Sequence, residues 1–189
     1  MDGRTTPSQT VGPYFSIGFS WLERSDLTEG ATGGARVSVR GRVLDGDGQP
    51  VPDAVLEIWQ ADAEGRYAHP EDGNDPAAGQ EFFGFGRVSV NEQGEFHFTT
   101  IKPGRFVGPN GELQAPHLEV SVFMRGLLRR LVTRIYFPGE PANERDEVLG
   151  LVPAERRDTL VAQRSEAEPE MLVWDVHLQG DQETVFFDY

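Results

Sequence analysis

The chain has 189 residues, enough for one domain with a hydrophobic core and too few for two comfortable ones. It has no cysteine, which excludes disulfides, thiolate nucleophiles and iron–sulfur clusters, so a metal site would need histidine, tyrosine or carboxylate ligands. The net charge of −14 disfavours nucleic-acid binding because it would repel the phosphate backbone. With neither an apolar run of about 18 residues nor a secretory signal, we expect a cytoplasmic protein without membrane contact.

Residues 1–34 are rich in glycine and threonine and show little hydrophobic pattern. We therefore predict an extended N-terminal arm there. The arm could lie on its own domain or, as the sharper hypothesis, on a partner subunit. Residues 35–189 are predicted to form a single β-sandwich core domain.

Six segments after the arm alternate apolar and polar residues, the period typical of half-buried strands. They are 36–43, 55–59, 95–99, 117–122, 133–137 and 171–178. Asp45–Gly48 and Asn91–Gly94 carry turn residues that tolerate a positive φ between such strands. One short helix is expected at 153–165, with Pro153 in its first turn. The pattern predicts an all-β fold, a sandwich or a barrel.

The segment Gly41–Leu56 is a strand–turn–strand unit similar to those of many transthyretin-like sandwiches, and alone it indicates a fold without a chemistry. Other segments resemble intradiol aromatic-ring dioxygenases: Thr6–Tyr14, Leu56–Tyr67, Thr99–Gly104, Ala115–His117 and Thr133–Gly139. The arm is most similar to that of α subunits from two-subunit members of this family. The resemblance, which runs from about Thr5 to the C-terminus, implies an intradiol-type β-sandwich.

In the resembled family, two tyrosine phenolates, two histidines and a solvent hydroxide hold ferric iron, because phenolates suit this hard ion. The catechol substrate chelates the iron, reacts with O2 and opens between its hydroxylated carbons. The matching positions here carry Asn74, Phe106, His117 and Glu119, and Gln114 stands where the family has a substrate-stabilising arginine. Phenylalanine cannot coordinate a metal and an asparagine amide is a weak ligand, so we expect this chain to bind no metal.

His117 and Glu119 lie two residues apart on a predicted strand and therefore share a face. This pair leaves open a weak divalent site, although two ligands do not make a tight cage. The alternative is a polar pair whose hydrogen bonds are satisfied by neighbouring groups.

The resemblance implies that Fe(III) is bound by a related β subunit and that the active site lies where the subunits meet. The expected partners are this β subunit in a higher-order α/β oligomer, a small aromatic substrate and O2. The pocket residues that it implies in this chain are Thr10, Gly12, Pro13, Tyr14 and Arg134. Glycine allows close backbone approach and proline fixes a turn, although Gly12–Pro13 could be an ordinary turn.

Arg134 is expected to face a carboxylate on the substrate ring, which would offset the negative field of the chain locally. A surface ion pair is its alternative role. The nearby cluster of Arg125, Arg129 and Arg130 is interpreted as a solvated loop, with steering of an anion as the alternative. The apolar stretch Phe82–Phe85 is a candidate piece of subunit interface.

Two other functions remain open from the sequence. One is a stand-alone intradiol-type enzyme with an altered metal site at His117 and Glu119. The other is a non-enzymatic transthyretin-like binding module, which would leave the arm segment Thr6–Tyr14 unexplained.

Overall fold

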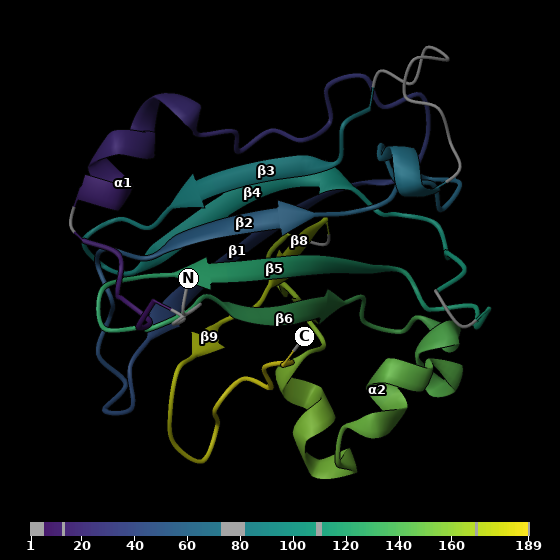
Figure 1. Ribbon diagram of the computed structural model, residues 1–189. Coiled ribbons are helices and arrows are strands. Elements are labelled where there is room, and N and C mark those ends of the chain that lie inside the picture. The colour runs from purple at the N-terminus through teal and green to yellow at the C-terminus, as the bar shows by residue number, and fades with distance from the viewer. Residues whose placement is uncertain (1–5, 13, 73–81, 109–110, 169, 189) are drawn as a thin grey trace, which may run out of the picture.

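The computed structural model describes residues 6–12, 14–72, 82–108, 111–168 and 170–188. These residues form two β-sheets packed face to face, with short helices at the periphery (Figure 1). One sheet has the strand order β4-β1-β8-β7, with β9 also paired to β1, and the other has the order β3-β2-β5-β6. The expected all-β fold is confirmed, as a sandwich.

The strands are β1 Arg36–Leu44, β2 Val55–Trp59, β3 Phe85–Ser89, β4 Glu95–Ile101, β5 His117–Phe123, β6 Leu131–Tyr136, β7 Gln163–Arg164, β8 Met171–Val173 and β9 Val176–His177. The α-helices are α1 Tyr14–Phe19 and α2 Glu147–Leu151. The 3-10 helices are Ser20–Leu22, Pro70–Asp72, Pro141–Arg145 and Ala154–Thr159. Within the described ranges, none of these helices has the length and apolar character needed to cross a membrane.

The core lies between the two sheets and follows the alternation seen in the sequence. On β5, Leu118, Val120 and Val122 are fully buried and face the other sheet. On β1 and β4, Val39 and Phe98 meet them from the opposite side. Each such side chain stabilises the fold by about 1.5–3 kcal/mol relative to exposure to water. The alternate residues of β5, which include His117 and Glu119, therefore project from the outer face.

Both expected turns form as the sequence predicts. Gly48 and Gly94 have φ of 72° and 71°, in the left-handed region that favours glycine. The Asp45 carboxylate accepts hydrogen bonds from the backbone N–H groups of residues 47 and 49, and the Asn91 side chain does the same in its own turn. Because these bonds join residues that are close together in the chain, the local sequence is sufficient to specify both turns.

The helix expected at 153–165 is shorter than predicted and is a 3-10 helix that ends at Thr159. The chain then turns to pair with β6, because the Tyr136 N–H donates to the Leu160 carbonyl and the Ala162 N–H donates to the Tyr136 carbonyl. Residues 163–164 continue as β7. Tertiary hydrogen bonding thus overrides the local helical preference.

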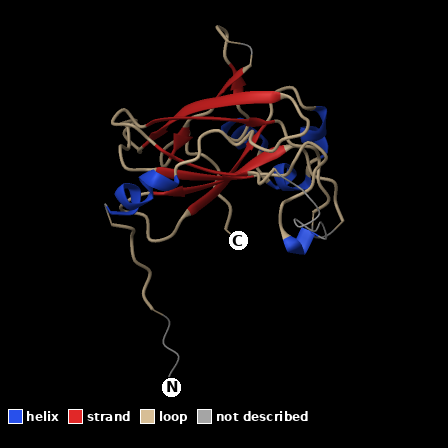
Figure 2. Ribbon diagram, turned by 90° about the horizontal axis from the view of Figure 1, so that it is seen from above, coloured by secondary structure: helices blue, strands red, loops and turns tan. Residues whose placement is uncertain are grey.

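The arm is less extended than predicted because residues 14–19 form α1. Phe15 and Phe19 stack edge to face at 4.9 Å, and Phe15 also packs against Phe123 at the end of β5, with ring centroids 5.3 Å apart. This aromatic contact anchors the helix on the outer face of the second sheet. Figure 2 shows the segment before α1 leaving the body of the sandwich as a loop.

Both edges of the second sheet are covered by other parts of the chain. At β3, Arg24 of the arm forms an antiparallel bridge with Arg87. At β6, Val132 is bridged by Phe187 and Tyr136 by Val161, both from the last third of the chain.

Candidate functional site

A row of paired residues crosses the outer face of the second sheet. Trp59 on β2 pairs with Phe85 on β3 and with Glu119 on β5, and Glu119 pairs in turn with Arg134 on β6. Directly paired residues of antiparallel strands project from the same face. The row therefore collects two aromatic rings, a carboxylate and a guanidinium outside the core.

These residues line a hollow of about 1000 Å³ at one end of the sheet. Its aromatic wall continues with Tyr67, which stacks on Trp59 at 5.9 Å, and with Phe106, which meets Tyr67 edge to face at 5.2 Å. Gln114, Glu112, Glu119 and Arg134 supply polar lining. The hollow thus combines a wall of aromatic side chains with charged groups.

Two loops hold Tyr67 and Phe106 in this wall. The Asp62 carboxylate accepts hydrogen bonds of 2.9 Å from the backbone N–H groups of Glu64 and Arg66 and from Arg66 Nε. The N–H of Gly104 donates to the Asp62 carbonyl at 2.8 Å, which joins the second loop to the first. The segments Leu56–Tyr67 and Thr99–Gly104, both noted in the sequence, are therefore joined at their ends in the structure.

The guanidinium of Arg134 lies at the floor of the hollow, where the residue is only 5% exposed. Its Nη1 donates to Gln114 Oε1 at 2.8 Å and lies 3.4 Å from the hydroxyl oxygen of Tyr136. Tyr136 in turn donates its hydroxyl proton to Asp146 Oδ1 at 3.0 Å. Burial raises the pKa of Tyr136 well above its usual value, so its phenol stays neutral and is no phenolate ligand.

His117 is buried beside this floor, with 3% of its surface exposed. Its Nδ1 lies 2.8 Å from the Ala115 carbonyl oxygen, which can only accept, so Nδ1 carries the proton and Nε2 is an acceptor. Nε2 is buried and has no hydrogen-bond partner within the described part of the chain. Burial, and after it the positive charge of Arg134, lower the pKa of His117 to about 4.

The donor set does not fit a ferric ion. Phe106 lies 5.6 Å from His117, ring centroid to ring centroid, so the structure brings together two of the positions matched to ligands in the resembled family. Glu119 lines the same hollow, and Asn74 lies outside the described residues. The described positions offer one neutral imidazole and one carboxylate, and no group of three or more His, Cys, Asp or Glu gathers among the described residues. The guanidinium opposite Glu119 also disfavours the alternative divalent site.

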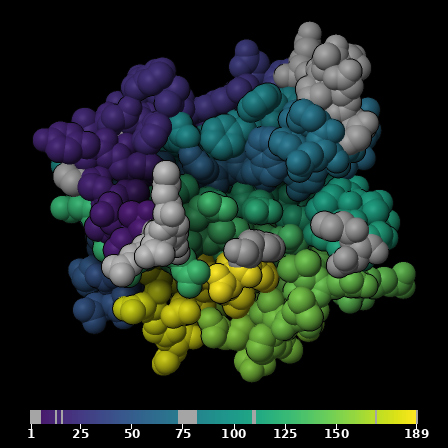
Figure 3. Space-filling view, in the orientation of Figure 1, coloured from purple at the N-terminus to yellow at the C-terminus, as the bar shows by residue number. Residues whose placement is uncertain are grey.

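The arm residues lie at the other end of the same sheet face. Thr10 Oγ1 accepts a hydrogen bond of 2.7 Å from the Gly126 N–H, and the Gly12 carbonyl accepts one of 3.0 Å from the Phe15 N–H. Tyr14 is 80% exposed. Pro13 lies outside the described residues. Figure 3 shows the first described part of the arm, in purple, at the left of the molecule.

The structure therefore does not bring Arg134 together with the arm. Arg134 pairs with Glu119 on β5, whereas α1 packs on Phe123, four residues further along the same strand. Four residues of an extended strand span about 13 Å. One cation beside the arm is Arg125, which precedes Gly126, is 59% exposed in its side chain and forms an ion pair with Asp53. Another is Arg87, whose guanidinium lies over the Phe19 ring of α1 at 4.6 Å. From the sequence, Arg125 was interpreted as part of a solvated loop. Its position beside the arm became clear only from the pairing of the strands.

The Phe82–Phe85 stretch is only partly available for an interface. Phe82 is 4% exposed and belongs to the interior, whereas Phe83 is 52% exposed and packs edge to face on Trp59. The prediction for this stretch is wrong at Phe82, because the chain turns there into β3.

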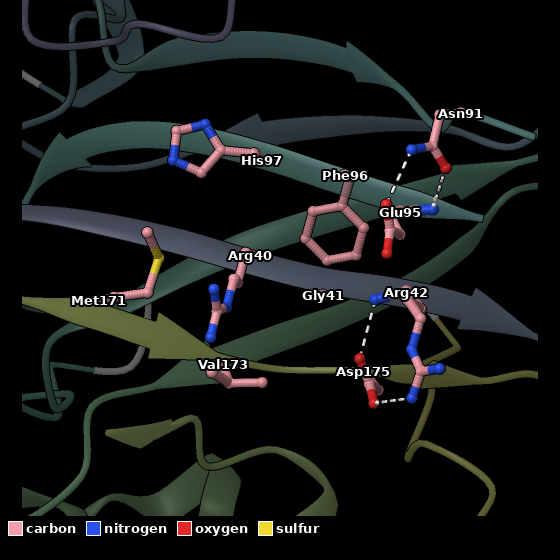
Figure 4. Close-up of a pocket in the computed structure, with 10 residues that line it drawn as sticks. All are labelled: Arg40, Gly41, Arg42, Asn91, Glu95, Phe96, His97, Met171, Val173 and Asp175. Atoms are coloured by element: carbon pink, nitrogen blue, oxygen red, sulfur yellow. Dashed lines mark hydrogen bonds and ion pairs between the residues drawn. The ribbon is translucent and has the colours of Figure 1, made fainter. Parts of the chain in front are cut away.

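A second hollow of about 530 Å³ lies on the outer face of the first sheet (Figure 4). Its polar groups largely bond one another: Arg42 N–H donates to Asp175 Oδ1 at 2.8 Å, and Asn91 Nδ2 donates to Glu95 Oε2 at 2.9 Å. His97 is exposed at its margin. Polar groups that bond one another in this way are typical of a solvated sheet face. The aromatic hollow of the second sheet is therefore the better candidate site.

Acidification is expected to destabilise the protein through His117. Below pH 6.5 the unfolded chain takes up a proton that folded His117 does not accept until about pH 4, so stability falls as the pH falls through this window. The loss should reach about 3 kcal/mol. Urea unfolding at several pH values should show a shallower decline for His117→Gln than for the parent chain. Equal declines would contradict the expectation.

A family model described as Dioxygenase matches residues 11–180. The protocatechuate 3,4-dioxygenase alpha chain of Burkholderia cepacia is 42% identical over 199 residues, covering 98% of this chain and 98% of that one. The protocatechuate 3,4-dioxygenase beta chain of the same organism is 37% identical over 146 residues, covering 76% of this chain and 62% of that one. The dioxygenase domain of a carbohydrate-binding fusion protein from Streptomyces sp. SirexAA-E shares the fold, with a TM-score of 0.62, 24% identity and coverage of 98% and 96%. The chain therefore belongs to the intradiol dioxygenase family, and over almost its full length it is similar to protocatechuate 3,4-dioxygenase alpha chains.

Proposed function

We propose that this chain is the non-iron-binding α subunit of a protocatechuate 3,4-dioxygenase. In the assembled enzyme a related β subunit holds Fe(III), and the ring of 3,4-dihydroxybenzoate is opened with O2 to 3-carboxy-cis,cis-muconate. Both oxygen atoms of O2 end in the two new carboxylates, so the reaction balances without another reductant. The observation that carries the proposal is the near full-length likeness to an alpha chain, together with Phe106 and Glu119 at family ligand positions.

The arm is proposed to form part of the wall of the substrate pocket on the β subunit, through Thr10, Gly12, Pro13 and Tyr14. The support is the unusual exposure of its apolar side chains: Tyr14 is 80% exposed, Ile17 65% and Trp21 79%. Large apolar side chains gathered on one surface segment are typical of protein–protein contacts. Residues 1–34 would then pack on the partner, and residues 35–189 would form the core domain of a higher-order α/β oligomer.

The negative charge of the chain requires a local cation wherever a carboxylated substrate approaches. Arg125 meets this need at the arm, because it precedes Gly126, whose N–H binds Thr10, and its side chain is 59% exposed. Arg134 is buried in the hollow at the other end of the sheet face. We therefore propose Arg125 as the cation that faces the ring carboxylate, with Arg134 as the competing assignment.

The test is reconstitution with the β subunit. The full chain purified alone should contain no stoichiometric iron and should consume no O2 with protocatechuate. After mixing with the β subunit, the complex should contain iron and open the ring. Activity or stoichiometric iron in the isolated chain would overturn the proposal, and loss of that iron in His117→Ala would identify a stand-alone enzyme. Absence of any association with the β subunit would favour the binding module.

In the reconstituted enzyme, Arg125→Gln should raise the KM for protocatechuate about tenfold while leaving the KM for catechol nearly unchanged, because catechol lacks the carboxylate. The size follows from the loss of one partly exposed charge-assisted hydrogen bond. Steady-state O2 uptake with both substrates gives the ratio. Arg134→Gln is the matched comparison, and a larger shift in its ratio than in that of Arg125→Gln would return the carboxylate role to Arg134.

A further inference from the structure

Helix α1 is held on the outer face of the second sheet by two aromatic side chains (Figure 1). Phe15 and Phe19 are four residues apart, share one side of the helix and are half-buried. Phe15 packs on Phe123 of β5, with ring centroids 5.3 Å apart. The guanidinium of Arg87 on β3 lies over the Phe19 ring, 4.6 Å from its centroid. Since β2 lies between β5 and β3, the two contacts together fix both the place and the direction of α1.

The side chain of Arg87 is itself held in place by the neighbouring strand. Its Nε and Nη2 both donate to Glu57 Oε1, at 2.9 and 2.5 Å, and Glu57 is its direct partner on β2. The two side chains are 15% and 25% exposed. A guanidinium is flat, so its edge can bind a carboxylate while its face lies on an aromatic ring. Arg87 and Glu57 therefore form a prearranged seat for the Phe19 ring.

The arm is anchored separately after α1. The Arg24 N–H donates to the Arg87 carbonyl at 2.8 Å, and the Arg87 N–H donates to the Arg24 carbonyl at 3.2 Å. Leu27 is fully buried and lies so close to Gly86 that a Cβ there would come 2.5 Å from a leucine methyl carbon. The six-residue α1 lies before this anchor, and so short a helix is not stable without tertiary contacts. Its placement therefore depends on the aromatic contacts described above.

We infer that Arg87 is a positioning residue: its guanidinium, held by Glu57, seats Phe19 and so determines where α1 presents its exposed side chains. These include Tyr14 and Ile17, which are 80% and 65% exposed. The inference rests on the proposed function, in which this part of the arm belongs to the wall of the substrate pocket. Arg87 acts on that pocket through the arm, without touching the substrate.

The first experiment uses the isolated full chain and chymotrypsin, which cleaves after aromatic residues and does not recognise arginine. Arg87→Gln should speed cleavage within residues 14–22 about tenfold, because proteolysis follows the population in which the helix has left its seat. Arg87→Lys keeps the charge but loses the flat guanidinium, and its rate should fall between those of Arg87→Gln and the parent chain. Arg42→Gln is the control: Arg42 also lies on a strand and pairs with a carboxylate, that of Asp175, but on the other sheet. Its effect should be less than about twofold, since an exposed ion pair contributes little.

A double-mutant cycle separates the seating of the helix from general stability. Phe19→Leu removes the ring, so adding Arg87→Gln to that variant should change the cleavage rate less than about twofold. Urea unfolding of each variant shows how much of any change in rate comes from global unfolding.

The second experiment measures steady-state O2 uptake by the complex with the β subunit. Arg87→Gln should raise the KM for protocatechuate and for catechol by the same factor, about threefold, with kcat nearly unchanged, because a displaced wall affects both substrates alike. This pattern differs from that expected for Arg125→Gln, in which only the KM for protocatechuate rises.

Equal cleavage rates for Arg87→Gln and the parent chain would overturn the inference, and so would a tenfold effect that persists in Phe19→Leu. A KM effect confined to protocatechuate would also overturn it, because Arg87 would then bind the substrate carboxylate itself. Faster cleavage with unchanged KM values would support the seat and count against the arm as a wall of the pocket. Inactivity of the parent complex would contradict the proposed function and leave the result with chymotrypsin in force.

Discussion

Replacing Asp146 by alanine is expected to lower the free energy of unfolding by about 4 kcal/mol, because a buried carboxylate with several hydrogen bonds is removed. Asp146 is 3% exposed. Its Oδ2 accepts from the Ala115 N–H at 2.7 Å, and its Oδ1 accepts from the Tyr136 hydroxyl at 3.0 Å and from the Leu149 N–H at 2.8 Å. The substitution leaves three buried donors without an acceptor and removes the N-terminal cap of α2.

Urea unfolding followed by circular dichroism measures this loss. Asp45→Ala is the matched control, because its carboxylate also accepts two backbone N–H groups but lies in a surface turn. That change should cost only about 1 kcal/mol, since water replaces the lost bonds. Asp146→Asn keeps one oxygen acceptor and should fall between the two. Comparable losses for Asp146→Ala and Asp45→Ala would contradict the assigned role of burial.

The second large effect is expected for Gly65→Ala, which should destabilise the fold by about 3–4 kcal/mol through a backbone clash and an unfavourable φ. Gly65 has a φ of 83°, and a Cβ added there would lie 1.9 Å from the Arg105 carbonyl oxygen. Because that contact is with backbone, the loops that carry Tyr67 and Phe106 would have to separate. The variant should therefore loosen the aromatic wall of the hollow as well.

Gly48→Ala separates the two costs. Gly48 has a φ of 72°, and a Cβ there would meet nothing within 4 Å, so only the conformational cost of about 1 kcal/mol applies. Thermal or urea unfolding of both variants gives the difference. If the two substitutions cost the same, the close approach of the loops at Gly65 would have no energetic weight.

Most strands could be predicted from the sequence because their alternation reflects the burial of one face. The strand β3 was missed, since Phe85-Gly86-Arg87 is short and interrupted by a glycine. That glycine is required by packing, as a Cβ at Gly86 would lie 2.5 Å from a methyl carbon of Leu27. The segment 171–178 was predicted as one strand but divides into β8 and β9, because Trp174 turns into the core and Asp175 binds the Arg42 N–H. Such long-range contacts leave no local pattern.

Part of the candidate site could also be predicted. The motifs that resemble the family placed Phe106, His117 and Glu119 at ligand positions. In the structure Phe106 and Glu119 line one hollow, and His117 lies against Phe106, with ring centroids 5.6 Å apart. Arg134 was predicted, from the family's motif, to line the substrate pocket together with the arm residues, and a strand pattern does not tell which end of the sheet another segment covers. That information came from the pairing of Arg134 with Glu119 and from the packing of Phe15 on Phe123.

The covering of β3 by Arg24 and of β6 by Phe187 and Val161 has a consequence for assembly. A sheet whose border strands already have backbone partners offers little template for a strand from another molecule. At these bridged positions the second sheet is therefore unsuited to growth by a strand from another molecule. For the same reason, shortening the C-terminal tail would leave the backbone of Val132 unpaired at the edge of the sheet. Such an edge strand pairs readily with other molecules and promotes fibril formation.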